Sequence, residues 1–97
     1  MTAVPVELRV AVARELDRLV RGELPDLLHW VSNYGAVLVR QPDAIWDHRC
    51  TDALRTTDGG WHLVLPLFTE AESPSDLSAE VIVDQMGHAT LHDVDVL

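Results

Sequence analysis

The chain has 97 residues, of which 47% are hydrophobic, and a formal net charge of −9 at pH 7. This length suits a single core, so we expect residues 1–97 to form one domain. No apolar run approaches the ~20 residues of a membrane span, and the first residues lack the pattern of a secretory signal. Because Cys50 is the only cysteine, an internal disulfide is excluded, and we expect a cytoplasmic, reducing location.

The charge is unevenly distributed along the chain. Residues 1–55 hold eight acids and all seven arginines, a net of −1, whereas residues 56–97 hold eight acids and no arginine or lysine, a net of −8. An acidic field repels nucleic acid and acidic membranes and attracts basic proteins or cations. We therefore expect neither nucleic acid nor membrane as a partner and favour a basic protein. Solubility alone is the other explanation of such a surface.

The first third of the chain has the periodicity of two helices. Apolar side chains recur at helical spacing over residues 5–21, and Gly22 suits a left-handed cap. A second helix begins at Pro25 and is closed by Gly35. The short link between them predicts an antiparallel or steeply crossed pair.

The middle of the chain is less regular. Residues 36–41 are apolar and β-branched, which indicates a short strand or an extension of the second helix. Residues 42–47 suit a single helical turn with Ile45 and Trp46 directed inward. Residues 48–57 precede a Gly-Gly turn and are predicted to form the outer strand of a hairpin.

Two strands joined by an acidic loop form the centre of the predicted sheet. Alternate residues in each strand are apolar, which predicts an antiparallel pair with one buried side. That side carries Trp61, Leu63, Leu65, Leu67, Leu77, Ala79, Val81 and Val83. Pro66 cannot donate to a ladder, so we expect its strand to lie at an edge or to contain a bulge.

The last element, residues 88–97, is a strand whose apolar residues change parity between Leu91 and Val94. A β-bulge near His92 and Asp93 would return them to one face. The fold is therefore predicted to be α+β, with two N-terminal helices packed on an antiparallel sheet of three or four strands ordered as a meander.

Several short segments occur together in a known family. The segments are the strand that begins at Trp61, Phe68-Thr69-Glu70, Ser75-Asp76-Leu77, the acidic-aliphatic tail 91–97, Leu19–Gly22, Tyr34-Gly35 and Pro42-Asp43. This set resembles a family of small, uncharacterised bacterial proteins of about this length, and the likeness covers most of the chain. The resemblance implies the same fold and no particular activity.

We expect no metal site and no cofactor. Side chains four residues apart on a strand lie ~13 Å from each other, so His88 and His92 cannot both reach one ion, whose ligands lie ~2 Å away. A bulge that brought His92 near Asp93 or Asp95 would supply too few ligands.

Nucleophilic catalysis is not expected either. Cys50 has His48 two residues away but no surrounding motif. Ser73 and Ser75 lie in the acidic loop, outside any Gly-x-Ser-x-Gly elbow. The sequence therefore favours a protein without enzymatic activity.

The first function hypothesis is a non-enzymatic protein that binds a basic partner, such as an immunity protein or an antitoxin. The second sheet face, with Val64, Pro66 and Phe68, is too apolar to be fully exposed to solvent. The chain itself, a partner or a second copy in a homodimer would cover it. The expected partner-binding residues on this face and its rim are Phe68, Glu70, Glu72, Asp76, Glu80, Ile82 and Asp84.

The alternative is a small-molecule-binding domain or minor enzyme. Its pocket would lie between the helices and the sheet. Trp30, Trp46 and Trp61 would line this pocket, with His62 or His92 as the polar group. A structural or self-associating module is the third hypothesis.

Overall fold

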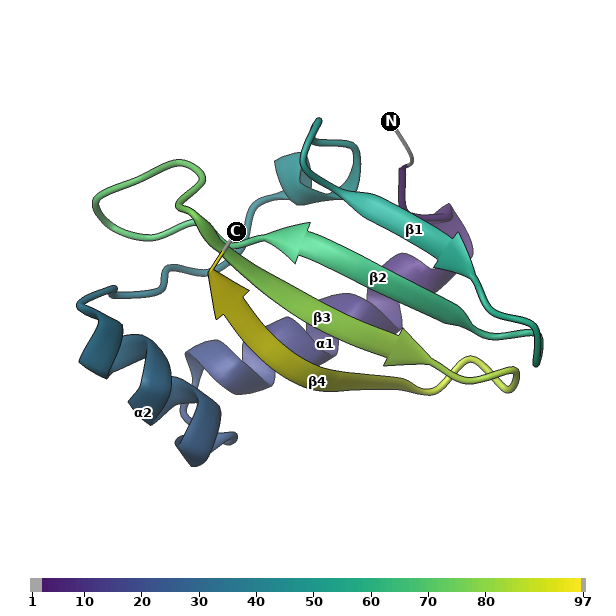
Figure 1. Cartoon of the computed structure of the whole chain (residues 1–97), viewed down its shortest axis with the longest axis horizontal. Coiled ribbons are helices and arrows are strands. Elements are labelled where there is room, and N and C mark those ends of the chain that lie inside the picture. The colour runs from purple at the N-terminus through teal and green to yellow at the C-terminus, as the bar shows by residue number, and fades with distance from the viewer. Residues whose placement is uncertain (1–2, 97) are drawn as a thin grey trace.

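The computed structural model describes residues 3–96 and has the predicted α+β architecture (Figure 1). The strands lie in the order β1-β2-β3-β4 with antiparallel neighbours, so the sheet is a four-stranded meander. Leu97, expected to end the last strand, lies outside the described residues. With η marking a 3₁₀ helix, the elements are η1 (Val6–Leu8), α1 (Arg9–Val20), α2 (Pro25–Tyr34), η2 (Asp43–Trp46), β1 (Asp52–Arg55), β2 (Trp61–Pro66), β3 (Leu77–Val83) and β4 (Ala89–Val96).

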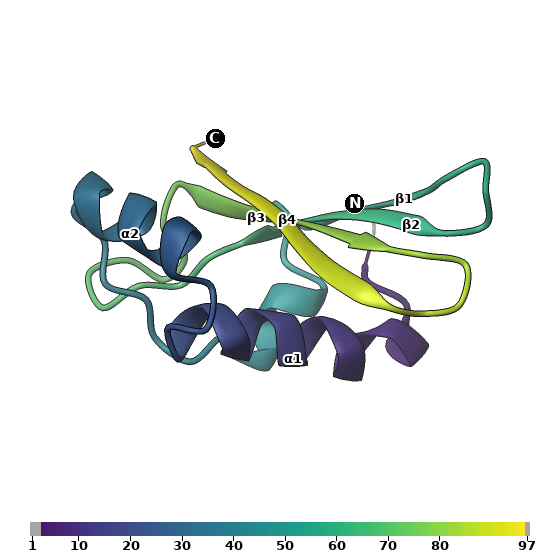
Figure 2. The ribbon, with the colours of Figure 1, turned by 90° about the horizontal axis from the view of Figure 1, so that it is seen from below.

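The helices cover only one face of the sheet. Figure 2 shows α1 running beneath that face, whereas α2 lies beside the end of the sheet where β4 finishes. Within residues 3–96, no helix lies over the opposite face (Figure 2), which we call the outer face. None of the helices in this range is long and apolar enough to cross a membrane.

α1 packs on the sheet through one apolar stripe. Val12, Leu16 and Leu19 recur at helical spacing and are buried. Gly22 has a φ of 84°, the left-handed conformation expected for it, and its N–H donates to the carbonyl of Leu19 at 3.1 Å. The chain turns at once into α2, which begins at Pro25 as predicted.

The inner face of the sheet carries the alternating apolar residues. Leu63 lies opposite Val81, and Leu65 lies opposite Ala79. All four are fully buried. The predicted antiparallel pair with one buried side is therefore confirmed.

β4 contains the predicted bulge. Glu80 lies opposite Asp93, and the next residue of β3, Val81, lies opposite Leu91, so His92 has no opposite residue. The extra residue restores parity, and the buried apolar residues on both sides of the bulge share the inner face.

The prediction that Pro66 restricts its strand to an edge or a bulge is wrong, because β2 is an interior strand. Pro66 is the last residue of β2, and pairing with β1 ends at Val64. The next N–H, that of Leu67, donates to the carbonyl of Leu77 on the β3 side. Successive N–H groups point to opposite sides of a strand, so the missing donor lies on the β1 side, beyond the end of that strand.

The segment between α2 and β2 is mostly irregular. Residues 36–41 form an isolated bridge, Leu38 to Thr69, in place of a full strand. The expected helical turn is η2, in which Ile45 and Trp46 are buried. The expected outer strand is confirmed, at reduced length, as β1.

Candidate functional site

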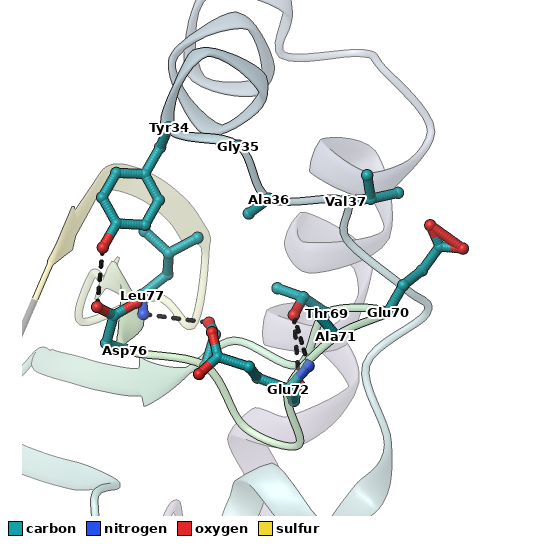
Figure 3. A pocket seen from close by; sticks show the side chains of 11 residues that line it. Tyr34, Gly35, Ala36, Val37, Thr69, Glu70, Ala71, Glu72, Asp76 and Leu77 are labelled. Carbon is teal, nitrogen blue, oxygen red and sulfur yellow. Dashed lines mark hydrogen bonds between the residues drawn. The ribbon is translucent and has the colours of Figure 1, made fainter.

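A cleft of about 360 Å³ lies between the end of α2 and the loop that joins β2 to β3 (Figure 3). The helix side contributes a tyrosine and the residues that follow the helix, and the loop side contributes three carboxylates. The lining residues are Tyr34, Gly35, Ala36, Val37, Thr69, Glu70, Ala71, Glu72, Ser75, Asp76 and Leu77.

The two walls of the cleft are joined by backbone pairing. The N–H of Glu70 donates to the carbonyl of Val37 at 2.9 Å. The side-chain amide of Gln41 donates to the carbonyl of Phe68 at 2.9 Å and accepts from the N–H of Phe68 at 2.8 Å. Gln41 thus pairs with Phe68 as a neighbouring strand would, and the segment after α2 is held against the start of the loop.

The acidic loop is ordered by its own short polar side chains. Thr69 accepts a hydrogen bond from the N–H of Glu72 at 3.1 Å. Ser75 is buried, and its hydroxyl donates to the carbonyl of Leu67 at 2.7 Å and accepts from the N–H of Leu77 at 3.1 Å. The loop therefore presents its carboxylates on a defined backbone.

Tyr34 connects the two walls directly. Its hydroxyl donates to Oδ2 of Asp76 at 2.8 Å (Figure 3). This bond, followed by desolvation and the negative charges of Asp76 and Glu72, raises the pKa of Tyr34. Behind it, Trp30 stacks on the Tyr34 ring with a centroid distance of 5.8 Å and an interplanar angle of 3°. Both rings stay well exposed, Trp30 at 41% and Tyr34 at 46%.

The cleft has a negative potential without an internal counter-charge. No arginine, lysine or histidine is among its lining residues. The carbonyl end of α2 adds a partial negative charge, and the last turn of this helix contains no basic residue. In Figure 3 the carboxylates of Glu72 and Asp76 lie on the Tyr34 side, whereas that of Glu70 points away near Val37. The cleft is therefore suited to a cation.

The seven predicted partner-binding residues lie in separate places. Glu70, Glu72 and Asp76 line the cleft. Phe68 is half-buried against the hydrophobic core. The other three lie away from the cleft: Glu80 and Ile82 on the outer face of β3, and Asp84 in the β3–β4 turn.

The apolar face proposed for a homodimer is less open than its composition suggests. Pro66 is buried, and Val64 and Phe68 are half-buried. The most exposed large apolar side chains of the outer face are Leu54, at 62%, and Ile82, at 37%.

The five residues of the alternative pocket do not line the cleft. Trp30 lies on α2, whereas Trp46 is buried in η2. Trp61 belongs to β2, where the guanidinium of Arg55 lies 5.2 Å from its ring centroid. The two histidines are likewise separate: His62 lies on the outer face of β2, opposite Ile82 of β3, and His92 is the bulge residue of β4.

A second acidic cluster lies on the outer face. Carboxylate oxygens of Glu80, Asp93 and Asp95 lie within 4.8 Å of one another, and His62 Nε2 lies 3.1 Å from Glu80 Oε1. The spacing of residues along one strand could not reveal this cluster, because β3 and β4 both contribute to it. Such oxygen donors suit hard divalent cations, and the expectation of no metal site stays a prediction.

Glu80 and Asp95 of the outer cluster shift each other's pKa in opposite directions. A hydrogen bond with Glu80, together with desolvation and the charge of Glu80, raises the pKa of Asp95. The same bond, with a smaller contribution from His62, lowers the pKa of Glu80. Of these two carboxyl groups, Asp95 therefore retains a proton to higher pH than Glu80.

The Nδ1 atom of His48 does not act as a base for the thiol of Cys50. The thiol residue is exposed, and His48 Nδ1 accepts a hydrogen bond from the backbone N–H of Cys50 at 3.0 Å. The lone pair of that nitrogen is therefore engaged in the turn.

Tyr34 is the residue of the cleft that the site prediction missed. The available signal was the spacing of Trp30 and Tyr34, four residues apart and thus neighbours on one helix face. That pair directly precedes the capping residue Gly35, which has a φ of 95°.

Fold and cleft together define a small α+β protein with a helix pair, a four-stranded meander and an acidic cleft at one end of the sheet. The chain belongs to the family described as "Domain of unknown function (DUF7668)", whose model matches residues 6–97. Neither the curated proteins nor the solved structures contain a match to the chain.

Proposed function

We propose that the protein is a non-enzymatic binding protein that captures a basic protein partner, in the manner of an immunity protein or antitoxin. The observation that supports this most directly is the cleft, whose charged lining residues are all carboxylates: Glu70, Glu72 and Asp76. Bacterial origin and a cytoplasmic location are part of the same proposal.

The distribution of charge supports the same function. Residues 56–97 have a net charge of −8, and this half of the chain provides the loop side of the cleft. A field of one sign raises the rate at which an oppositely charged partner arrives, and salt screens it within about 10 Å at 0.1 M. Three of the eight acids in this half, Glu70, Glu72 and Asp76, line the cleft, and the other five add to the field that would attract a basic partner to the sheet.

A small-molecule function is the second candidate. The observation that favours it is the volume of the cleft, about 360 Å³, which falls within the roughly 300–1,000 Å³ of small-molecule sites. A cationic compound would fit the lining for the same electrostatic reason as a basic protein.

A quantitative pull-down with charge-reversed variants tests the proposal. The cleft variant combines Glu70→Lys, Glu72→Lys and Asp76→Lys. A control with the same change in net charge reverses Glu7, Asp26 and Asp47, which are exposed and absent from the cleft lining.

The wild type and the control should enrich the same basic protein, and the cleft variant should lose it. Circular dichroism should show an unchanged fold, since exposed charges contribute little stability. Identical protein sets from all three chains would contradict the proposal and put the small-molecule candidate first.

A further inference from the structure

α2 ends at the cleft, which its last residue, Tyr34, lines, and this end of the helix lacks the positive charge that commonly accompanies a helix C-terminus. A cation there is stabilising, because the aligned peptide dipoles leave a partial negative charge at this end. The last turn of α2 contains no basic residue, and the residues that follow, Gly35 to Val37, line the cleft without supplying one. A cation from outside the chain can therefore take this position.

The shape of the site favours a planar cation. Tyr34, which stacks on Trp30 outside the cleft, contributes a ring to the lining and is 46% exposed, and guanidinium groups pack on such aromatic faces. Glu72 and Asp76 provide carboxylates on the Tyr34 side of the cleft (Figure 3), and a guanidinium can bond carboxylates through two parallel N–H groups. A lysine ammonium is compact and strongly hydrated, so it gains less from the aromatic ring and from the two carboxylates.

The cleft also has apolar wall for the stem of a long side chain. Ala36, Val37 and Ala71 line it, and Val37 is 58% exposed. Arginine buries its methylene groups along such surface while its charged end remains among polar groups.

We propose that the cleft is the receptor for one arginine side chain of the basic partner. The guanidinium lies between the carboxylates of Glu72 and Asp76, against the ring of Tyr34. This inference rests on the proposed function and adds the chemical group of the partner that the cleft recognises, a guanidinium. It makes Tyr34 a binding residue, with its hydroxyl bond holding Asp76 in place.

A titration monitored by NMR tests the proposal on the isotope-labelled chain. The probe is N-acetyl-L-arginine N-methylamide, which presents the side chain as it occurs within a protein. The lysine and citrulline derivatives with the same blocking groups are the comparisons, since citrulline keeps the shape and lacks the charge.

The arginine derivative should shift the amide resonances of residues 34–37 and 69–77 saturably. The lysine derivative should bind about fivefold or more weakly, because it lacks the planar fork, and the citrulline derivative should cause no saturable shift. Equal binding of the arginine and lysine derivatives would overturn the proposal, as would the absence of saturable shifts.

Matched variants localise the contact. Glu72→Gln and Asp76→Asn should each weaken the arginine derivative by about tenfold, the loss of one charge-assisted pair. Asp26→Asn removes the same charge from an exposed residue of α2 that does not line the cleft, so the dissociation constant of the arginine derivative should change by less than about twofold. Equal effects of all three would show diffuse attraction and overturn the proposal.

Free L-arginine distinguishes a protein side chain from a small molecule. If the free amino acid binds more than about tenfold tighter than the blocked derivative, the cleft recognises the α-amino or α-carboxyl group, and the partner's side chain is excluded. Partner capture that depends on the cleft acids, without binding of the blocked derivative, would overturn this inference and leave the proposed function standing. Binding of the blocked arginine derivative, together with partner capture that does not depend on the cleft acids, would overturn the proposed function.

Discussion

The side chain of Glu15 reaches from α1 to β4, where Oε1 accepts a hydrogen bond from the backbone N–H of Leu91 at 3.1 Å. β4 is an edge strand, and its bulge residue, His92, comes directly after Leu91. A buried N–H without a partner is costly. Glu15, itself only 8% exposed, satisfies this donor and fixes the helix to the bulged strand.

Glu15→Ala should lower the free energy of unfolding by about 1.5–3 kcal/mol, the range for hydrogen bonds to a charged group. Urea unfolding monitored by circular dichroism measures it. Arg18 bonds the other oxygen of Glu15 at 2.8 Å, but its side chain is 42% exposed, so Arg18→Ala should cost less than about 1 kcal/mol. If the two substitutions cost the same, the bond to Leu91 contributes nothing beyond a surface ion pair.

The two faces of the sheet should respond differently to truncation. Leu65 is fully buried on the inner face, so Leu65→Ala should cost about 2–5 kcal/mol. Leu54 lies on the outer face and is 62% exposed, so Leu54→Ala should stay within about 0.5 kcal/mol of the wild type. Similar losses at both positions in urea unfolding would show that the outer face is covered.

Ultraviolet absorbance can follow the titration of Tyr34 alone, because the chain contains one tyrosine. The hydrogen bond to Asp76 favours the neutral phenol and raises the pKa of Tyr34. The midpoint should therefore lie above the ordinary value of about 10, and Asp76→Asn should lower it. An unchanged midpoint in Asp76→Asn would show that the bond is not formed in solution.

The outer carboxylate cluster should give Asp95→Asn a pH-dependent effect. The pKa of Asp95 is raised, so its contribution to stability is complete below the unfolded value of about 4 and is lost as the pH rises through the native value. Relative to the wild type, Asp95→Asn should raise the melting temperature at pH 7, and this gain should shrink toward pH 4. Glu70→Gln, in the β2–β3 loop, is the control. A gain of equal size at both pH values would contradict the raised pKa of Asp95.

The sheet could be predicted from sequence because its signals are local. Alternation places Leu63 and Leu65 on one face, and the change of parity in β4 requires the bulge at His92. The position of Pro66 could not be read in this way, because strand order depends on where β1 ends. A proline is tolerated in an interior strand at a position beyond the end of the neighbouring strand.

The cleft was only partly predictable. The acids Glu72 and Asp76 stand out in the sequence as a charged loop. The tyrosine that bonds one of them lies 42 residues from Asp76, and only the packing of α2 beside the loop brings Tyr34 there. The outer cluster was missed for a related reason, because Glu80 belongs to a different strand from Asp93 and Asp95.

The central claim is that the acidic cleft captures a basic partner, and the association rate of the recovered pair tests it most directly. Surface plasmon resonance over a series of salt concentrations compares the wild type with the combined Glu70→Gln, Glu72→Gln and Asp76→Asn variant. The account predicts a wild-type rate that falls steeply as salt rises, since screening removes electrostatic steering, and a variant rate that is lower and depends less on salt. Equal rates with equal salt dependence in the two chains would contradict the claim.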